Sequence, residues 1–403
     1  MQTLPQIILD SRTRNFDGRH PWVMAHSIIE PTLPIENGTH VDLVRGDGNW
    51  IGRGVYNTSS RIRVRLYQWN QAASLDSEWL HSQLEYALQL RETYGNASQL
   101  SSLRLVNSEG DGLSGLIVDR FGDYVIVQLT SLAMWQWREE IVEWLVKRLS
   151  PAGIRVLVDT STASNESIPE TDEWIHGAEP AEEFVISDFG IQLSIDLKTG
   201  QKTGYYLDQR ANRQVAAQWI ERLANHRKPI RMLDVCCYLG GFSLAAAAKV
   251  EGAKVVAVDS SARALQAASK NAELNGIDNI EFVEGDCFDE LQKQSQTQEK
   301  FDAVILDPPR MASHKKQVPA ALRAYHRLNL MAVNALNHGG LLVTCSCTGR
   351  VSREDFTGLL ASVGKRTQRQ IQLLEIRGAD FDHPVAANCP EGEYLKCAIC
   401  RVE

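Results

Sequence analysis

The sequence predicts an α/β fold whose C-terminal half is a Rossmann-like domain. Within Arg231–Phe242, read RMLDVCCYLGGF, an apolar run, Met232–Val235, leads directly into a tight turn that contains Gly240 and Gly241. An Ala-rich stretch with helical propensity, Ser243–Lys249, follows the turn. Strand, glycine turn and helix in this order open a nucleotide-binding α/β unit, because glycines let the backbone approach a ligand closely. The turn is not GxGxxG, so it does not imply pyrophosphate binding.

Three further apolar runs each end in polar residues. They are Lys254–Val258 before Asp259, Ile280–Val283 before Gly285-Asp286-Cys287, and Asp302–Leu306 before Asp307-Pro308-Pro309-Arg310. In a parallel sheet these ends share one edge, where ligands bind. Asp259 is placed to accept hydrogen bonds from ribose hydroxyls, and Asp286 to reach an adenine amino group. The acid-Pro-Pro turn resembles the motif of S-adenosylmethionine (SAM) methyltransferases, so SAM is the expected cofactor.

The length and composition indicate an ordinary globular protein of two or three domains. The chain has 403 residues, of which 43% are hydrophobic and 23% charged. Because no apolar run reaches ~18 residues, no transmembrane helix is predicted. The first residues lack a basic and then apolar secretory pattern, so we expect a cytoplasmic protein whose eight cysteines are thiols.

Charge is distributed unevenly along the chain. The net charge is −8, and Pro151–Gly190 holds nine acids and one base. Pro308–Arg353 holds seven bases and no acid. A basic sector beside the predicted ligand edge favours recruitment of a polyanion such as RNA, although a solvated basic face would give the same pattern.

Residues 1–72 are predicted to form a small β domain. Its strands are expected at Val41–Val44, Trp50–Val55 and Ile62–Leu66. Arg61, Arg63 and Arg65 alternate with apolar residues and so point to one face of a strand. That face suits phosphate contacts, and an edge strand protected by charge is an equal alternative.

Residues 73–190 are predicted to form a central α+β domain. Amphipathic helices are expected at Trp79–Tyr94 and Ala133–Leu149. Strands are expected at Leu103–Val106, Leu116–Val118 and Tyr124–Leu129. The polar, acidic segment 165–183 is predicted to be an exposed loop.

Residues 191–403 are predicted to carry the catalytic site. Phe184–Leu197 indicates a hairpin, and Lys202–Arg210, read KTGYYLDQR, supplies polar and aromatic groups that could close over a cofactor. Beyond the Rossmann-like core we expect a helix at Ala320–Leu336 and a strand at Leu341–Thr344 that leads to Cys345-Ser346-Cys347. Two closing strands are expected, at Gln372–Arg377 and Tyr394–Val402.

Taken together, these motifs resemble the bacterial ribosomal RNA large-subunit methyltransferase I family over nearly the whole chain. The resemblance rests on RHPWV, EGDGLSGLIVDRFG, KTGYYLDQR, CCYLGGF, DPPR and CSCTG in the family order. It implies a PUA β-barrel at the N-terminus, a central domain, a Rossmann-like methyltransferase domain, SAM as cofactor and cytosine-5 methylation of RNA. The chain departs from the family in having DPPR for DPPK, Cys345 at an aromatic or apolar position, and an acidic rather than basic segment around 160–175.

The resemblance and the strand ends together give the expected site. Cys347 aligns with the nucleophile and Asp307 with the acid that faces the base. Residues expected to contact SAM are Tyr206, Asp208, Asp234, Cys237, Tyr238, Gly240, Gly241, Phe242, Asp259, Asp286, Cys287 and Asp307. Residues expected to contact RNA, most readily 23S ribosomal RNA, are Arg61, Arg63, Arg65, Lys202, Arg210, Arg310, Lys315 and Lys316.

Cytosine-5 chemistry requires a cysteine, because carbon 5 becomes nucleophilic only after a thiolate adds to carbon 6. Cys345 shares the strand parity of Cys347 and is the weaker candidate. Cys397 and Cys400 have a CxxC spacing but lie in an apolar run, so we expect core cysteines and no metal. The alternatives are an RNA guanine or exocyclic-amine methyltransferase and a SAM-binding ribosome-assembly factor. No membrane partner is expected, and a homodimer is compatible with the sequence.

Overall fold

The chain folds into two compact units. The computed structural model describes residues 4–11, 13, 18–95, 100–180, 184–197 and 204–403. The first unit comprises Met1–Glu182, Leu197–Gly204 and Phe381–Gly392, and the second comprises Glu183–Asp196, Tyr205–Asp380 and Glu393–Glu403. The chain therefore returns to the first unit after leaving it. No helix among the described residues is long and apolar enough to cross a membrane.

The first sheet of unit 1 has six strands in the order β2-β6-β5-β4-β1-β3. The strands are β1 (Gln6–Leu9), β2 (Trp22–Met24), β3 (Ile28–Ile29), β4 (His40–Val44), β5 (Trp50–Tyr56) and β6 (Ile62–Gln68). Their alternating apolar residues, such as Ile7, Val41 and Val64, form a core of their own. The three predicted strands are confirmed, whereas β1 to β3 are too short to show a period in the sequence.

The second sheet of unit 1 has five strands in the order β11-β10-β9-β8-β7. The strands are β7 (Ser102–Asn107), β8 (Leu116–Phe121), β9 (Tyr124–Leu129), β10 (Gly153–Val158) and β11 (Thr171–Gly177). Apolar residues of α1 (Ser77–Tyr94) and α3 (Arg138–Leu149) join its core. The predicted helix at 133–149 is in fact two helices, because α2 (Leu132–Gln136) ends before Trp137 and α3 begins after it.

The prediction of an exposed loop at 165–183 was wrong. Helix α4 (Thr160–Glu166) ends in this segment, and β11 pairs antiparallel with β10. Strand β11 lies at the sheet edge with mostly exposed side chains. Its ladder is formed by backbone groups, so polar side chains concealed the strand from a hydrophobicity pattern.

Unit 2 is a three-layer α/β domain built on a seven-stranded sheet in the order β16-β15-β14-β17-β18-β20-β19. The strands are β14 (Arg231–Val235), β15 (Lys254–Asp259), β16 (Ile280–Glu284), β17 (Phe301–Leu306), β18 (Leu336–Ser346), β19 (Ile371–Arg377) and β20 (Lys396–Val402). The first five in spatial order are parallel, and β20 runs antiparallel to both β18 and β19. A hairpin of β12 (Phe184–Asp188) and β13 (Ile191–Ile195) belongs to the same unit.

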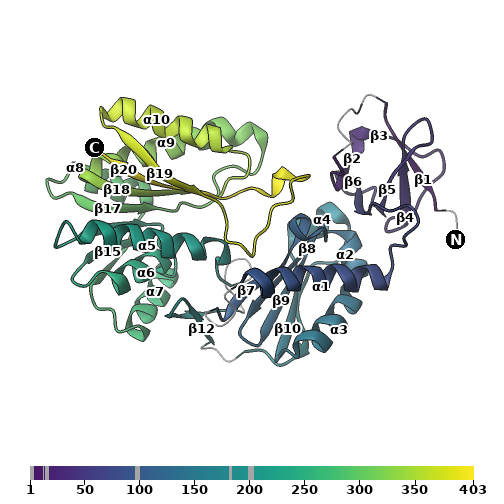
Figure 1. Ribbon diagram of the computed structural model, residues 1–403, viewed down its shortest axis with the longest axis horizontal. Coiled ribbons are helices and arrows are strands. Elements are labelled where there is room, and N and C mark those ends of the chain that lie inside the picture. The colour runs from purple at the N-terminus through teal and green to yellow at the C-terminus, as the bar shows by residue number, and fades with distance from the viewer. Residues whose placement is uncertain (1–3, 12, 14–17, 96–99, 181–183, 198–203) are drawn as a thin grey trace. The chain divides into compact units, whose positions relative to one another are not determined.

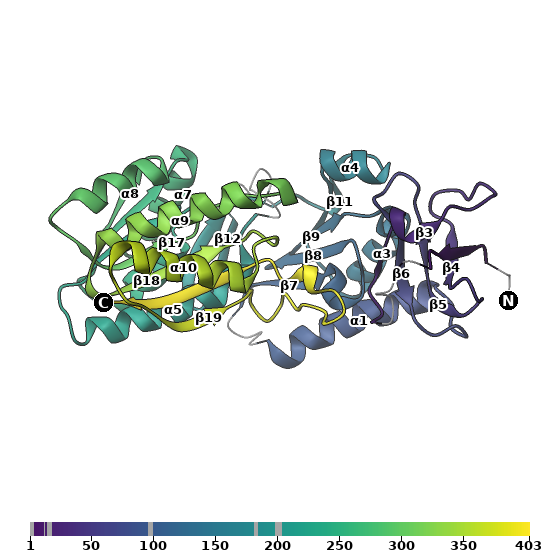
Figure 2. The same ribbon diagram turned by 90° about the horizontal axis from the view of Figure 1, so that it is seen from above.

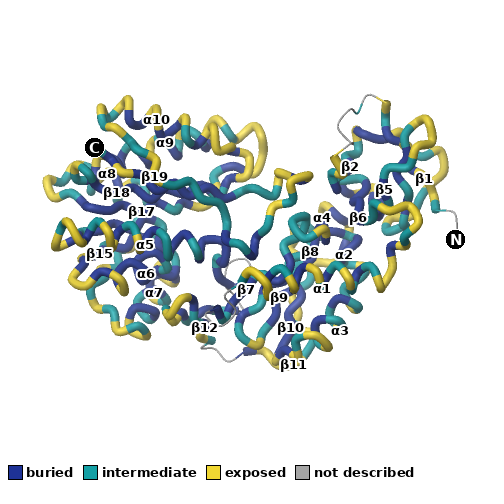
Figure 3. The backbone as a smooth tube through the Cα atoms, in the orientation of Figure 1, coloured by how far each residue is buried: buried dark blue, intermediate teal, exposed yellow. Residues whose placement is uncertain are grey.

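Helices cover both faces of this sheet (Figure 1). One face carries α5 (Arg210–Ala224), α6 (Gly241–Lys249) and α7 (Ala262–Leu274), and the other carries α8 (Cys287–Gln296), α9 (Val318–Ala335) and α10 (Arg353–Thr367). Helices α9 and α10 lie side by side (Figure 2). The strands between the helices are buried while the outer helix faces are exposed (Figure 3). The strand order reverses between β14 and β17, and the crevice at such a switch point is where open α/β sheets bind ligands.

Candidate active site

The turn after β14 brings backbone and carboxylate groups to the switch point. Gly240 adopts a left-handed conformation with φ +80°, which a side chain would strain. Asp234 at the end of β14 is fully buried, and its Oδ2 accepts hydrogen bonds from the Ser243 backbone N (3.0 Å) and Oγ (2.6 Å). Its Oδ1 is buried without a hydrogen-bond partner. Burial raises the pKa of Asp234 to about 6.

Two more acids stand at neighbouring strand ends. Asp259, after β15, accepts hydrogen bonds from the backbone N–H groups of Tyr238 and Ser261, both at 2.9 Å. This ties the second strand end to the glycine turn. Asp286 is exposed and caps α8, where its Oδ1 accepts from Phe288 N at 2.8 Å. Cys287 begins that helix and is half-buried.

The segment before α5 approaches the same turn. The ring of Tyr206 meets that of Tyr238 edge to face, with centroids 5.3 Å apart. Burial raises the pKa of Tyr206, and neighbouring Tyr238, Asp208, Cys347 and Asp307 act in the same direction. Asp208 is buried and accepts a hydrogen bond from Tyr394 Oη at 2.6 Å. Tyr206 therefore contacts the glycine turn and lies within electrostatic reach of the expected catalytic pair.

Asp307 and Cys347 come from the adjacent parallel strands β17 and β18. Cys347 is half-buried, with its Sγ 3.8 Å from the backbone oxygen of Pro308. Asp307 Oδ1 accepts a hydrogen bond from Gln209 Nε2 at 2.9 Å. Burial raises the pKa of Asp307 to about 7, and the nearby Asp208 carboxylate adds to that effect. The structure thus brings together the acid and the thiol that the sequence selected.

Cys345 is buried in the core, beside the Gln209 side chain that contacts Asp307. It is fully buried, pairs across the strands with Cys397, and packs in the cluster that includes Met232 and Val343. Burial and the contact with Cys397 raise the pKa of Cys345 well above its usual range. Parity places both cysteines on one face only while the strand is regular, and β18 ends at Ser346, before Cys347. A thiol so placed has no route to a substrate.

The sequence analysis missed Lys396. This lysine is only 1% exposed, pairs with Ser346 in the β18–β20 ladder, and donates to the backbone oxygens of Thr348 (2.8 Å) and Tyr394 (2.9 Å). Burial lowers the pKa of Lys396 to about 8, and the Cys347 thiolate opposes that shift. The available signal was a lysine directly before the apolar run Cys397–Cys400, because lysine is almost never fully buried without a partner.

Three other residues that we expected to contact the cofactor, Phe242, Cys237 and Gly241, pack within or beside the glycine turn. Phe242 is buried in the core between α5, α6 and the sheet, and Cys237 is buried below the turn. Gly241 is required by a close approach, because a Cβ there would lie 2.7 Å from Arg213 Nε. Arg213 in turn donates to the backbone oxygen of Tyr206 at 2.9 Å. The Arg213 side chain therefore lies against the glycine turn while it binds the Tyr206 segment.

The residues expected to contact RNA divide by exposure. Arg61 in unit 1 and Arg310, Lys315 and Lys316 in unit 2 are exposed. Arg63 is half-buried and donates to the Thr58 backbone oxygen. Lys202 lies outside the described residues.

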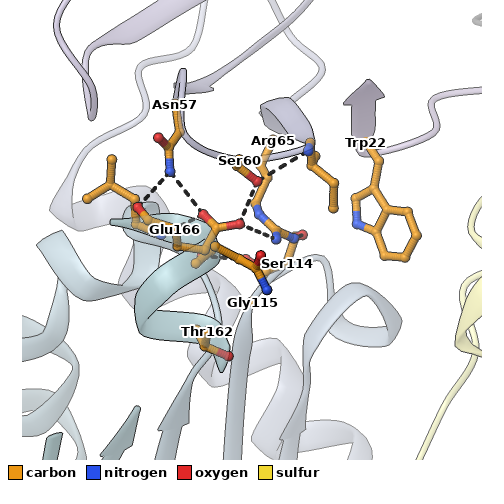
Figure 4. Close-up of polar contacts among 12 residues, drawn as sticks. Trp22, Asn57, Ser60, Arg65, Ser114, Gly115, Thr162 and Glu166 are labelled. Atoms are coloured by element: carbon orange, nitrogen blue, oxygen red, sulfur yellow. Dashed lines mark hydrogen bonds and ion pairs between the residues drawn. The ribbon is translucent and has the colours of Figure 1, made fainter. Parts of the chain in front are cut away.

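Arg65 and Arg210, by contrast, are buried rather than displayed. Arg210 pairs with Asp380 at 2.8 Å. Arg65 donates to Ser114 Oγ (2.9 Å) and to Glu166 Oε1 (3.1 Å). Figure 4 shows Glu166, from α4, meeting Arg65 of β6 and Asn57 and Ser60 of the loop between β5 and β6. The alternation of β6 gave the right face, but α4 and its neighbours cover that face at Arg65.

One further group in unit 1 has metal-binding residue types. Ligand atoms of His20, Cys389 and Glu391 lie within 4.8 Å of one another. However, His20 Nδ1 accepts the Trp22 backbone N–H at 3.0 Å, so the ring proton lies on Nε2, which faces Glu391 Oε2 at 3.1 Å. A metal-bound histidine instead donates its second ring N–H to an acceptor. We therefore assign this group to hydrogen bonding.

The donor set of unit 2 fits SAM. The unpartnered Oδ1 of Asp234 is a buried acceptor at the glycine turn, suited to the cofactor's amino group. Both Asp259 oxygens are fixed by backbone donors and retain lone pairs for ribose hydroxyls. When bound there, SAM would supply an electrophilic methyl group at the switch point, toward Asp307 and Cys347.

Comparisons with known proteins agree with this fit. Residues 226–379 match the family described as a methyltransferase domain, and residues 7–69 match that of a PUA-like domain. A SAM-dependent methyltransferase assigned in Streptococcus mutans has the same fold, with a TM-score of 0.81 at 20% identity over 99% of this chain and 100% of that chain. A second solved methyltransferase, in complex with SAH, has a TM-score of 0.82 at 21% identity over 99% of this chain and 100% of its own. The fold and site thus define a SAM-dependent methyltransferase with an N-terminal PUA-like domain.

Two full-length relatives specify the family. Proteins named ribosomal RNA large subunit methyltransferase I from Shewanella denitrificans and Erwinia tasmaniensis are 34% and 35% identical to this chain. The first alignment covers 97% of both chains, and the second covers 99% of this chain and 100% of the relative. The chain belongs to the ribosomal RNA large subunit methyltransferase I family.

Proposed function

We propose that this enzyme methylates carbon 5 of a cytosine in large-subunit ribosomal RNA through a covalent bond between Cys347 and carbon 6. The relatives' name supports the RNA class. The observation that carries the chemistry is the proximity of two half-buried groups, the thiol of Cys347 and the acid of Asp307, at adjacent strand ends beside the switch point. An N-methyltransferase has no use for a thiol there.

The thiolate begins the reaction. Addition of Cys347 Sγ to carbon 6 forms the S–C bond and pushes the ring π electrons toward N3, which takes up a proton. Asp307 is suited to give that proton because burial raises its pKa to about 7, so a large share is protonated at neutral pH. Bound SAM would supply the methyl group that carbon 5 of the resulting enamine takes up, and S-adenosylhomocysteine would be the leaving group. Loss of the carbon 5 proton to a base then expels the thiolate. N3 returns its proton to Asp307, which restores the neutral aromatic ring.

Lys396 completes the nucleophile. A cation near a cysteine favours the thiolate over the thiol. Lys396 is the first residue of β20 and lies opposite Ser346, the last residue of β18. Its ammonium donates hydrogen bonds to the backbone oxygens of Thr348 and Tyr394. It keeps its charge below a pKa of about 8, so it supports the Cys347 thiolate at neutral pH.

RNA recruitment is assigned to the exposed bases. Arg310, Lys315 and Lys316 follow Asp307 within nine residues of the chain. RNA phosphates that they bind would therefore lie close to the proposed catalytic residues. Arg61 gives the PUA-like domain a basic residue on its surface. Contacts of this kind weaken as salt rises, because binding releases counterions.

Trapping a covalent adduct tests the proposal. The wild type, Cys347→Ala and Cys345→Ala are incubated with labelled SAM and ribosomal RNA that contains 5-fluorocytosine, and then run on a denaturing gel. Fluorine blocks removal of the carbon 5 proton, so the wild type and Cys345→Ala should stall as protein–RNA adducts and Cys347→Ala should not. An adduct that persists in Cys347→Ala would reject this nucleophile. Methylation of ordinary RNA without any adduct would establish amine methylation instead, and SAM binding without methyl transfer would indicate an assembly factor.

A further inference from the structure

Asp307 is the end of a chain of hydrogen bonds that runs through α5 to β19. Gln209 Nε2 donates to Asp307 Oδ1 at 2.9 Å, and Gln209 Oε1 accepts from Asn212 Nδ2 at 2.7 Å. Asn212 also donates to the Gly378 backbone oxygen (3.0 Å) and accepts from Arg377 Nε (2.9 Å). Gln209 and Asn212 are buried, and the entire chain lies within unit 2.

The chemistry of the chain fixes its direction. Arg377 can only donate and the Gly378 carbonyl can only accept, so the amide of Asn212 has one permitted orientation. In that orientation an N–H group of Asn212 faces Gln209, so the side-chain oxygen of Gln209 must accept its hydrogen bond. The NH₂ group of Gln209 is therefore turned toward Asp307. Glu375 holds the far end, because it pairs with Arg377 at 3.2 Å and accepts from Trp219 Nε1 at 2.7 Å.

We propose that Gln209 is a positioning residue that holds Asp307 Oδ1 and presents Oδ2 to the target base, with Asn212 and Arg377 fixing the direction of its amide. Among the described residues, no hydrogen bond reaches Asp307 Oδ2. One carboxylate oxygen is thus committed to the protein and the other is left for a ligand. The role given to Asp307 rests on the proposed function, but the contact with Gln209 does not.

The same contact opposes the effect of burial on Asp307. Burial and the carboxylates of Asp208 and Asp234 favour the protonated acid, whereas the Arg213 guanidinium and the Gln209 amide favour the ionised form. These opposing effects together leave the pKa of Asp307 at about 7, where the acid can both give and regain a proton. Removal of the Gln209 amide should therefore raise the pKa of Asp307 and also allow its carboxyl group to rotate.

The test combines a carboxyl titration with kinetics on the full-length enzyme. Gln209→Leu removes the donor at similar size, and Asn212→Asp keeps the contact with Arg377 but allows the Gln209 amide to turn its oxygen toward Asp307. Gln218→Leu, on the exposed side of α5, is the matched control. Carboxyl ¹³C NMR, with the signal assigned through Asp307→Asn, follows the titration without RNA. The pH profile of kcat and the KM values for SAM and RNA are measured in parallel.

We expect the Asp307 pKa to rise by about one pH unit in both Gln209→Leu and Asn212→Asp. We also expect kcat to fall by roughly 10- to 100-fold, with its alkaline limb moved to higher pH and both KM values unchanged. Gln218→Leu should match the wild type. A titration that does not move in Gln209→Leu would overturn the proposal whatever reaction the enzyme catalyses. A titration that moves while the alkaline limb of kcat stays fixed would uphold the positioning contact and reject Asp307 as the proton donor of the proposed function.

Discussion

One buried carboxylate, Glu166, makes several of the hydrogen bonds between the two sheets of unit 1. It accepts hydrogen bonds from Ser60 Oγ (2.6 Å), Asn57 Nδ2 (3.1 Å), Arg65 Nη2 (3.1 Å) and Leu132 N (3.2 Å) (Figure 4). Its side chain is 7% exposed and that of Arg65 is 11% exposed, so water screens this pair poorly. We predict that Glu166→Gln makes local opening of this junction easier without disturbing unit 2.

The size of the effect follows from the contacts. Removal of one partner of a buried pair costs roughly 3–5 kcal/mol. Arg65 would keep Ser114 at 2.9 Å and Glu109 at 3.5 Å, and glutamine preserves the shape and one acceptor oxygen. We therefore expect a smaller effect, about 2–3 kcal/mol, for local opening at this junction. Amide hydrogen exchange there should accelerate by roughly 30- to 100-fold, since 1.4 kcal/mol corresponds to tenfold.

Hydrogen-exchange mass spectrometry of the full chain measures this directly. Peptides that cover β5, β6 and α4 should exchange faster in Glu166→Gln, while peptides from unit 2 serve as the internal reference. Glu173→Gln, an exposed acid on β11, is the matched control and should stay within threefold of the wild type. Acceleration below threefold in Glu166→Gln, or equal acceleration in Glu173→Gln, would refute the assignment of Glu166 as the anchor. In a double-mutant cycle with Arg65→Met, the combined loss should be smaller than the sum of the two.

Three further substitutions test the site of unit 2. Lys396→Met should slow alkylation of Cys347 below pH 8 and move the acid limb of the kcat profile to higher pH. The reason is that the thiolate loses a neighbouring ammonium, which is charged below a pKa of about 8. An acid limb that stays at the same pH would exclude Lys396 from the site. Gly241→Ala should weaken SAM binding by roughly tenfold in calorimetry. The reason is that the new Cβ would lie 2.7 Å from Arg213 Nε and would push that side chain away. Equal affinity for SAM would show that the turn adapts. Cys345→Ser should leave kcat within about twofold while unfolding becomes easier by about 1–3 kcal/mol in urea titration, since a hydroxyl replaces a core thiol; a large loss of kcat would restore Cys345 as a catalytic candidate.

The sheet of unit 2 was predictable because its strands are buried on both faces. Such strands read as continuous apolar runs, and β14, β15 and β17 begin and end within one or two residues of the predicted bounds. The acids directly after those runs then located one edge of the sheet. Local sequence order was sufficient, because parallel strands with short connections place consecutive ends together.

The contacts that orient the site were not predictable in this way. Gln209 and Asp307 are 98 residues apart, and Arg377 is 165 residues from Asn212. No period or motif links such positions, since their meeting depends on how β19 and β20 add to the sheet. Lys396 was concealed for the same reason, because its partners at the end of β18 are defined by antiparallel register. Catalytic residue types could be read from the sequence, whereas the groups that tune them required the fold.

The arginines at and before strand β6 show that residues in one alternating pattern can differ in burial and in role. Arg63 and Arg65 lie in the strand and Arg61 directly precedes it. Their exposure falls along the chain, from exposed Arg61 through half-buried Arg63 to buried Arg65. A buried guanidinium needs a carboxylate, and Glu166 and Glu109 supply two for Arg65. A phosphate could not compete there without breaking both pairs. Any RNA contact of this strand must therefore come from Arg61 and the half-exposed Arg63, while Arg65 holds the sheet that presents them.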